Sequence, residues 1–157
     1  MADLTVTRDI AAPSASLWTL VADLTRMGEW STENMGGSWV KGATGPALGA
    51  KFKGANAHGS KKWTTMATIT SCEPGKSFGF RVAVGPIKVA DWHYDFEDRG
   101  NGVTRVTETW TEQGPGLIQK LGKTASGVAD RRASNKASME ETLRRIEEFV
   151  LKSTKTP

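Results

Sequence analysis

The chain has 157 residues, of which 38% are hydrophobic and 24% are charged, and its formal net charge is +4. This length fits a single domain over residues 1–157, and the composition is typical of a globular protein. No apolar run approaches the roughly 20 residues that a helix needs to cross a membrane. Residues 1–5 have neither the basic nor the apolar part of a secretory signal, so we expect a cytoplasmic protein.

The basic surplus lies entirely in the C-terminal part of the chain. Residues 1–113 hold 12 basic and 12 acidic side chains, whereas residues 114–157 hold 9 and 5. Because acidic residues alternate with the basic ones there, a solvated helix face explains the surplus, and we expect no nucleic-acid partner. A weak contact with an anionic membrane surface or ligand stays open.

The sequence contains few features that would bind a metal or a cofactor. Cys72 is the only cysteine, which excludes an internal disulfide and a multi-cysteine metal site. The two histidines lack a second ligand at metal spacing, and the chain has no nucleophile elbow, phosphate-binding loop or dinucleotide fingerprint. We therefore expect neither a metal nor a cofactor.

The N-terminal third predicts a strand followed by two short helices. Leu4, Val6 and Ile10 indicate a first strand, which ends before Pro13. Apolar residues at helical spacing predict a helix over 17–24, and residues 23–30 indicate a second short helix or turn. Residues 36–49 contain five glycines and predict a short strand at 38–40 followed by a loop.

Five further strands follow, over residues 51–58, 61–72, 76–84, 88–97 and 103–112. Glycine-rich and proline-rich turns separate them, and such short connections predict an antiparallel meander. Successive side chains of a strand point to opposite faces. This alternation predicts one apolar face of the sheet and places His93 on the other face.

The remainder predicts one long helix, entered through residues 117–127 and ending in a frayed tail over 152–157. Its expected buried stripe is polar at the N-terminal end and apolar beyond it: Val128, Arg132, Asn135, Met139, Leu143, Ile146 and Val150.

An acidic residue, Glu108, falls on the apolar face between Val106 and Trp110. Burying a carboxylate is costly unless it is paired, hydrogen-bonded or neutralised, so we expect a cavity, a partner or a chemical role. Desolvation would raise the pKa of Glu108 and suit it to act as a general acid. The alternative is a structural carboxylate paired with Arg81 or Arg132, or capped by a tryptophan N–H.

Several segments resemble one known superfamily. They are Ile10-Ala11-Ala12-Pro13 before Leu17-Trp18, Met27-Gly28-Glu29-Trp30, Gly49-x-x-Phe52-x-Gly54-x-Asn56-x-x-Gly59 with Trp63, Trp92-x-Tyr94, and Thr104-Arg105-Val106-Thr107-Glu108-Thr109-Trp110. Together they resemble the SRPBCC (START/Bet v 1-like) superfamily, in particular its polyketide cyclase/dehydrase-like group, over essentially the whole chain.

The resemblance implies an α+β helix-grip fold. In this fold a curved antiparallel seven-stranded sheet wraps around a long C-terminal helix, and two short helices follow the first strand. An apolar cavity between sheet and helix would hold a lipid, a polyketide, or a sterol-like or aromatic molecule. Some relatives only carry such ligands, others cyclise, dehydrate or hydrolyse them, and a further branch activates a chaperone.

Further candidate residues would surround Glu108 in such a cavity. Asn56 and His58 share a row with Phe52 and are candidate ligand contacts, although Asn56 can instead satisfy backbone and His58 can be a solvated rim residue. The candidate stacking walls, which could equally fill the core, are Trp63, Phe80, Trp92, Tyr94 and Trp110. Arg132 and Asn135 could meet a ligand head group or lie at the edge of the stripe. Met27, Trp30 and Met35 could form a lid or a second apolar cluster.

The leading functional hypothesis is a binder of a small hydrophobic or aromatic molecule, with possible cyclase or dehydratase chemistry centred on Glu108. The enzymatic version needs a second proton-transfer group, for which Asn56 and His58 are the evident candidates. The alternative is a protein-interaction or stress-regulator module whose cavity is filled by side chains and whose basic helix contacts a partner.

Overall fold

Seven strands form one antiparallel sheet in the order β1-β7-β6-β5-β4-β3-β2. The computed structural model describes residues 1–114, 116 and 126–155. Six strands follow one another along the chain, and the first pairs with the last, so that Val6 lies opposite Glu108. The strands are β1 (Leu4–Ile10), β2 (Asn34–Val40), β3 (Lys51–His58), β4 (Lys61–Glu73), β5 (Ser77–Val84), β6 (Ile87–Gly100) and β7 (Val103–Glu112).

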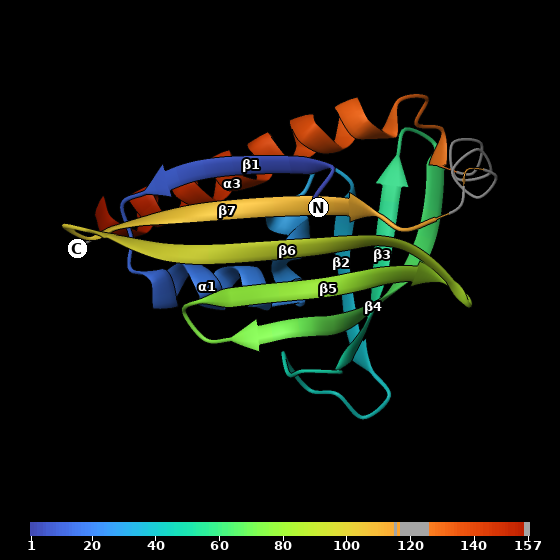
Figure 1. The fold of residues 1–157 in the computed structure, drawn as a ribbon, viewed down its shortest axis with the longest axis horizontal. Helices are drawn as coiled ribbons and strands as arrows, with labels where there is room; N and C mark the ends of the chain where they lie inside the picture. The colour runs from blue at the N-terminus through green and yellow to red at the C-terminus, as the bar shows by residue number, and fades with distance from the viewer. Residues whose placement is uncertain (115, 117–125, 156–157) are drawn as a thin grey trace.

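The helices lie on one face of this sheet (Figure 1). They are α1 (Ser14–Ala22), the 3₁₀ helix η1 (Leu24–Glu29) and α3 (Arg131–Lys155). In Figure 1 β2 and β3 run across the direction of β5, β6 and β7, and β4 bends from one direction into the other, so the sheet is strongly curved. A curved seven-stranded sheet, a long C-terminal helix and short helices after the first strand confirm the expected helix-grip fold.

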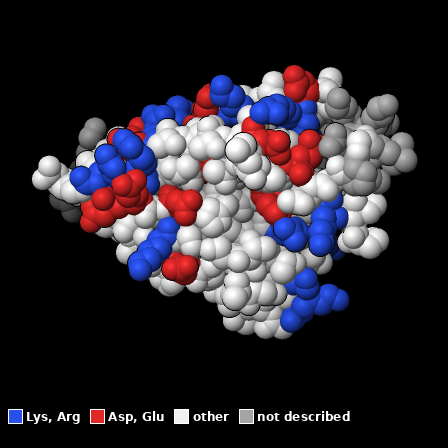
Figure 2. Space-filling model, in the orientation of Figure 1, with Lys and Arg blue, Asp and Glu red and all other residues white. Residues whose placement is uncertain are grey.

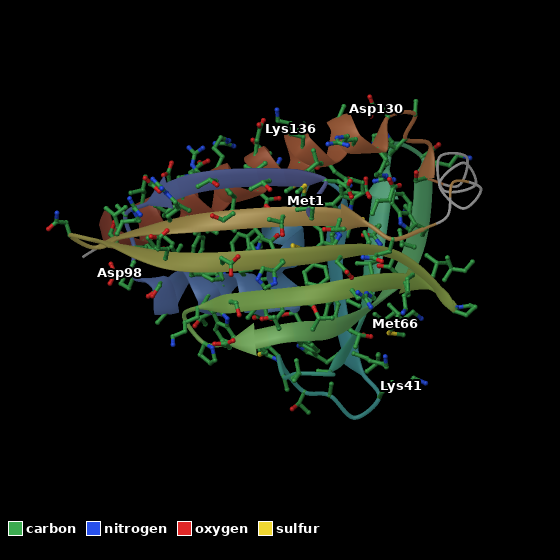
Figure 3. All side chains as sticks on the ribbon, viewed as in Figure 1. Met1, Lys41, Met66, Asp98, Asp130 and Lys136 are labelled. Atoms are coloured by element: carbon green, nitrogen blue, oxygen red, sulfur yellow. The ribbon has the colours of Figure 1, made fainter. Side chains whose placement is uncertain are left out.

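Alternation along the strands separates an inner face from an outer face, as expected from the period of two. Figure 3 shows the side chains of the described residues on the ribbon. Phe52, Phe80 and Tyr94 are buried, whereas Arg81 and Asp91 pair with each other on the outer face with an Nε–Oδ1 distance of 2.6 Å. His93 lies on this outer face beside Asp95, with an Nε2–Oδ1 distance of 3.1 Å.

Several elements differ from the sequence prediction: α1 begins at Ser14 and not at residue 17, and β6 extends to Gly100 and not only to residue 97. The second short helix is a 3₁₀ helix that begins after Asp23, whose carboxylate accepts a hydrogen bond from the Thr25 N–H. Strand β2 begins at Asn34, four residues earlier than expected, and has an irregular register between Asn34 and Gly37. A Cβ atom at Gly37 would lie 2.0 Å from the Lys53 carbonyl oxygen, so only glycine allows this close approach.

The core fills the space between α1, α3 and the inner face of the sheet over part of its length. Leu17 of α1 and Leu143 of α3 are fully buried, as is Ile10 at the end of β1. The Trp18 indole N–H donates to the Ser77 carbonyl oxygen at 2.7 Å and ties α1 to β5. Most of the expected helix entry, 117–125, lies outside the described residues; α3 itself starts at Arg131 and is helical through Lys155, within the tail expected to fray.

The surface charges are interleaved on the face shown in Figure 2, where basic and acidic side chains lie side by side. On α3, Arg144 bonds both Glu141 and Glu148, which fits the expectation of a solvated helix face. None of the helices in the described part of the chain is long and apolar enough to span a bilayer.

Candidate functional site

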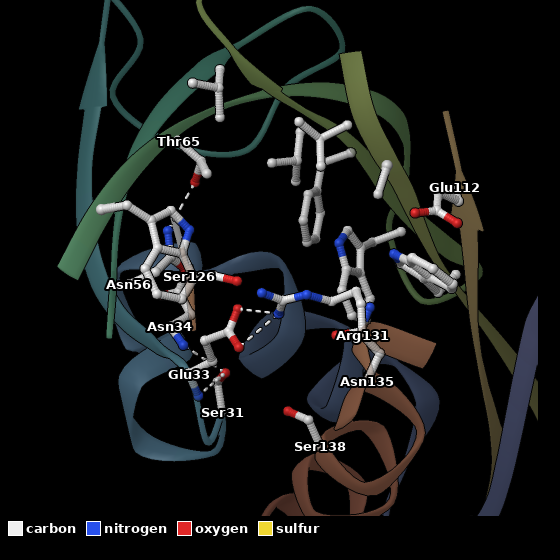
Figure 4. A pocket seen from close by; sticks show the side chains of 18 of the residues that line it. Ser31, Glu33, Asn34, Asn56, Thr65, Glu112, Ser126, Arg131, Asn135 and Ser138 are labelled. Carbon is white, nitrogen blue, oxygen red and sulfur yellow. Dashed lines mark hydrogen bonds and ion pairs between the residues drawn. The ribbon is translucent and has the colours of Figure 1, made fainter. Parts of the chain in front are cut away.

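A cavity of about 560 Å³ lies between the inner face of the sheet and the first half of α3. Its volume falls in the range of small-molecule sites. Residues of β3 to β7 form one wall, the loop after η1 forms a second, and α3 forms a third (Figure 4). Exposed Val84 and Ile87 lie on its rim. The alternative expectation, an interior filled by side chains, is not met.

Glu108 lines this cavity and is only 2% exposed. Its Oε1 accepts a hydrogen bond of 2.7 Å from the Tyr94 hydroxyl, which comes from the directly opposite position on β6. Its Oε2 is buried and has no hydrogen-bond partner among the described residues. A buried polar atom without a partner costs free energy, so this oxygen marks a place for a ligand or a proton.

The surroundings of Glu108 favour its neutral form. Burial raises its pKa from the ordinary value of 4.5 to about 8, although the hydrogen bond from Tyr94 lowers it. Burial also raises the pKa of Tyr94 well above its ordinary value, helped by the nearby Glu108. At neutral pH the protonated Glu108 can therefore donate a hydrogen bond from Oε2 while Oε1 accepts from Tyr94.

Glu108 does not bond any of the groups that the sequence suggested as its structural partners. Arg81 pairs with Asp91 on the opposite face of the sheet, and Arg132 donates from Nη2 to the Asp3 carbonyl oxygen at 2.6 Å. In the part of the chain that the structure describes, no tryptophan N–H bonds the carboxyl group. Tyr94, which the sequence suggested only as a stacking wall, is its partner.

Asn56 lines the cavity, but its amide is already bonded within the protein. It accepts from Asn34 at 3.3 Å and donates to the Thr65 hydroxyl at 3.1 Å. His58 is exposed at the end of β3 and does not line the cavity, because strand alternation there ends at the turn. The expectation that His58 meets a ligand is therefore wrong for the cavity seen here.

The five expected aromatic walls all line the cavity: Trp63, Phe80, Trp92, Tyr94 and Trp110. Phe80 and Trp110 are buried, and Trp63 and Trp92 are partly exposed. The Arg131 guanidinium lies over the Trp63 ring, 5.9 Å from its centroid. These side chains come from β4 to β7 and give the sheet wall a large aromatic surface, which suits a flat apolar ligand.

The sequence did not indicate the ion pair at the N-terminal end of α3. Arg131 Nη1 donates to both oxygens of Glu33, at 2.7 and 2.8 Å, and joins α3 to the loop after η1 (Figure 4). Asn135, an expected contact, is buried and lines the cavity without a hydrogen bond to any described residue. Arg132 also lines it, although its side chain is largely exposed.

The three expected lid residues do not act together. Met27 is buried and lines the cavity. Trp30 packs in the core against Phe149, with ring centroids 5.7 Å apart, and is not a cavity wall. Met35 is 64% exposed and lies on a separate surface depression. Residues 27–35 leave the 3₁₀ helix and enter β2, so these side chains point in different directions.

Among the described residues, no group of three or more histidine, cysteine, aspartate or glutamate side chains could hold a metal ion. Cys72 is partly buried, and burial raises the pKa of its thiol.

Comparison with known proteins identifies the family. The family model described as "Polyketide cyclase / dehydrase and lipid transport" matches residues 1–150. The chain belongs to this family. The match confirms the resemblance to the polyketide cyclase/dehydrase-like group, and the helix-grip fold is consistent with the wider SRPBCC superfamily. A search of curated proteins finds no match.

Solved structures share the fold of this family member over nearly its whole length. A polyketide cyclase-like protein of Corynebacterium glutamicum is 29% identical to this chain, with a TM-score of 0.66. The match covers 97% of this chain and 93% of that protein. A protein of Mycobacterium smegmatis is 20% identical to this chain, with a TM-score of 0.64. The match covers 96% of this chain and 91% of that protein. The di-domain ARO/CYC protein BexL of the BE-7585A biosynthetic pathway is 12% identical, with a TM-score of 0.68; the match covers 99% of this chain and 48% of BexL.

Proposed function

We propose that this family member binds a small apolar or aromatic molecule in the cavity, with an oxygen of the ligand accepting a hydrogen bond from protonated Glu108. The observation that carries the proposal is the buried Glu108 Oε2, which faces a cavity of about 560 Å³ and has no partner among the described residues. The aromatic walls supply most of the contact area, and the carboxyl group orients the ligand.

The same arrangement supports an acid-catalysed reaction as an extension of binding. A neutral carboxyl group that donates to a ligand carbonyl polarises it and can transfer the proton when charge develops on the oxygen, as cyclisation or dehydration requires. Of the two second groups suggested from the sequence, His58 does not line the cavity, and the Asn56 amide already bonds Asn34 and Thr65. Tyr94 is the group that contacts Glu108 directly. Binding is therefore the primary proposal.

A pair of matched probes tests the binding step. Acetylnaphthalene and ethylnaphthalene have similar size and shape, and only the first carries a carbonyl oxygen. We expect the ketone to bind about fivefold more tightly, from about 1 kcal/mol for the added hydrogen bond. Quenching of tryptophan fluorescence measures both affinities, because three tryptophans line the cavity.

Two variants separate hydrogen bonding from acidity. Glu108→Gln keeps a donor and should keep the preference for the ketone, whereas Glu108→Leu should remove it. Native mass spectrometry of the purified protein then identifies any compound that co-purifies, and turnover of that compound should be lost in both variants if Glu108 is the acid. Equal affinities of ketone and hydrocarbon for the unaltered protein would refute the role of Glu108, and failure of both to bind would refute the binding proposal.

A further inference from the structure

Asn135 of α3 is a buried side chain whose amide bonds no group of the described fold. It is 6% exposed, lines the cavity and makes no hydrogen bond with any described residue. Figure 4 shows it on α3 between Arg131 and Ser138, among the side chains that line the cavity. A primary amide has two N–H donors and an acceptor oxygen, and leaving them unbonded in a buried position costs free energy. The amide is thus available to a molecule in the cavity.

The other buried polar side chains of the cavity wall mostly have partners within the protein. In the part of the chain that the structure describes, five such side chains line the cavity: Asn56, Glu108, Ser126, Asn135 and Thr142. Asn56 has the two partners given above. Ser126 accepts from the Val128 N–H and Thr142 donates to the Trp30 carbonyl oxygen, each at 3.4 Å. Only the Asn135 amide and the Oε2 of Glu108 are left without a partner among the described residues.

Folding alone does not account for an asparagine at this position. Asn135 lies on the buried stripe of α3, which continues through the apolar residues Met139, Leu143 and Ile146. An apolar side chain there would leave no polar group unbonded, and asparagine is a weaker helix former than leucine or methionine. A contact with a ligand explains why a polar group stands at this place.

The neighbours of Asn135 on α3 place it beside Trp110 of β7. Residues three and four positions apart lie on one face of a helix. Arg132, three positions earlier, donates to the Asp3 carbonyl oxygen, and the Asp3 N–H donates to the Trp110 carbonyl oxygen at 2.9 Å. Met139, four positions later, packs in one buried cluster with Trp110. Asn135 therefore faces the cavity from the helix side at the level of Trp110.

A single ligand can reach both Asn135 and Glu108. Trp110 follows Glu108 by two residues on the same face of β7, and two residues of a strand span about 7 Å. This span is comparable with the length of a two-ring aromatic molecule. The cavity of about 560 Å³ has room for such a molecule with its substituents.

From this arrangement we infer that Asn135 is a second hydrogen-bonding point of the cavity and binds a hydroxyl group. Ligands that carry both a carbonyl and a hydroxyl group are then preferred over ligands with the carbonyl alone. The inference rests on the proposed function and adds the chemical class of the ligand. Protonated Glu108 can only donate from Oε2, which suits a carbonyl oxygen, whereas a hydroxyl group can accept from the Asn135 amide N–H or donate to its oxygen.

Naphthalene ketones with and without a hydroxyl group test this preference. The probes are acetylnaphthalene and the acetylnaphthols whose hydroxyl group lies on the ring that does not carry the acetyl group. Calorimetric titration at about neutral pH measures each affinity. We expect the best acetylnaphthol to bind about fivefold more tightly than acetylnaphthalene, which is the contribution of one neutral hydrogen bond.

Two substitutions of Asn135 test whether its amide is the source of the gain. In Asn135→Leu and in the smaller Asn135→Ala, the ratio of the two affinities should fall from about five to about one. Lys136→Leu is the matched control, because it introduces leucine at the next position of α3, which is exposed and does not line the cavity. It should keep the ratio at about five.

Thermal unfolding without ligand gives a readout that a structural role of Asn135 would move the other way. Asn135→Leu removes an unbonded buried amide, so its unfolding midpoint should rise by about 2–4 °C. A lower midpoint would show that the amide stabilises the fold through a bond of its own and would overturn the inference.

The binding data separate this inference from the proposed function. The inference is wrong if no acetylnaphthol binds more tightly than acetylnaphthalene, if the gain survives both Asn135 variants, or if Lys136→Leu abolishes it. In each of these cases, a preference for acetylnaphthalene over ethylnaphthalene would still support the role of Glu108. If acetylnaphthalene did not bind at all, both proposals would fall.

Discussion

Replacing Glu108 by glutamine should change how the stability of the protein depends on pH. The pKa of Glu108 is about 8 in the folded protein and 4.5 is its ordinary value, which we take for the unfolded chain. Between these values the unfolded chain releases a proton that the folded protein keeps, so the free energy of unfolding falls as pH rises. Below 4.5 both states are protonated and above about 8 both are ionised, so the effect is confined to that window.

The size of the effect follows from the two pKa values. Each pH unit in the window removes about 1.4 kcal/mol from the free energy of unfolding, which gives a loss of about 4 kcal/mol between about pH 5 and about pH 9. Glutamine is neutral throughout and lacks this dependence. Its amide carries two N–H donors where the protonated carboxyl group carries one O–H, and the extra unpaired donor costs about 1–3 kcal/mol at every pH. The variant should thus be less stable than the unaltered protein at about pH 5 and more stable at about pH 9.

Urea unfolding at several pH values measures this crossover. The quantity to compare is the difference in the free energy of unfolding between the two proteins, because other titrating groups cancel in it. Glu140→Gln, which replaces an exposed glutamate on α3, controls for the loss of one carboxyl group. A difference between Glu108→Gln and the unaltered protein that stays constant over this pH range would refute the argument that Glu108 is buried and neutral.

Two further substitutions test the hydrogen bond to Glu108 and the close strand packing at Gly37. Tyr94→Phe leaves both Glu108 oxygens without a partner, so it should cost about 1–3 kcal/mol and raise the pKa of Glu108 above about 8, since the lost hydrogen bond lowers it. Carbon-13 NMR titration of the carboxyl group measures this pKa, and an unchanged value would contradict the assignment. Gly37→Ala should lose more than about 2 kcal/mol in thermal unfolding because its Cβ would overlap the facing strand. Gly42→Ala, with φ of 84° but open space, should lose only about 1 kcal/mol, and equal losses would contradict the packing argument.

Strand alternation and turn signals were sufficient to predict the sheet and the burial of Glu108. A period of two fixes which side chains share a face, and the short connections leave an antiparallel meander as the simple topology. They could not identify Tyr94 as the partner of Glu108. That pairing depends on the register of β6 against β7, which the irregularity between Asp98 and Gly100 shifts, and alternation does not determine register.

The outer parts of the site depend on contacts between distant segments, which local patterns do not encode. Glu33 and Arg131 are separated by 98 residues and meet because the loop after η1 lies beside the start of α3. The helical stripe pointed to Arg132 instead, since it repeats at three to four residues and cannot distinguish neighbours at the end of a helix. Trp30 was a plausible lid from its size and position, but packing against α3 buries it.

Stability and ligand binding should be controlled by the same proton on Glu108. A carbonyl oxygen can accept a hydrogen bond from Oε2 only while the carboxyl group is neutral, so affinity for a ketone should fall as Glu108 ionises above about pH 8, by about the fivefold that this hydrogen bond contributes. The stability difference described above stops changing near that same pH. Both properties arise from burial of one carboxyl group beside a cavity, and in the proposed function the ligand bonds the oxygen that has no partner among the described residues. A ketone affinity that changed at a different pH from the stability would therefore locate the responsible group elsewhere in the cavity wall.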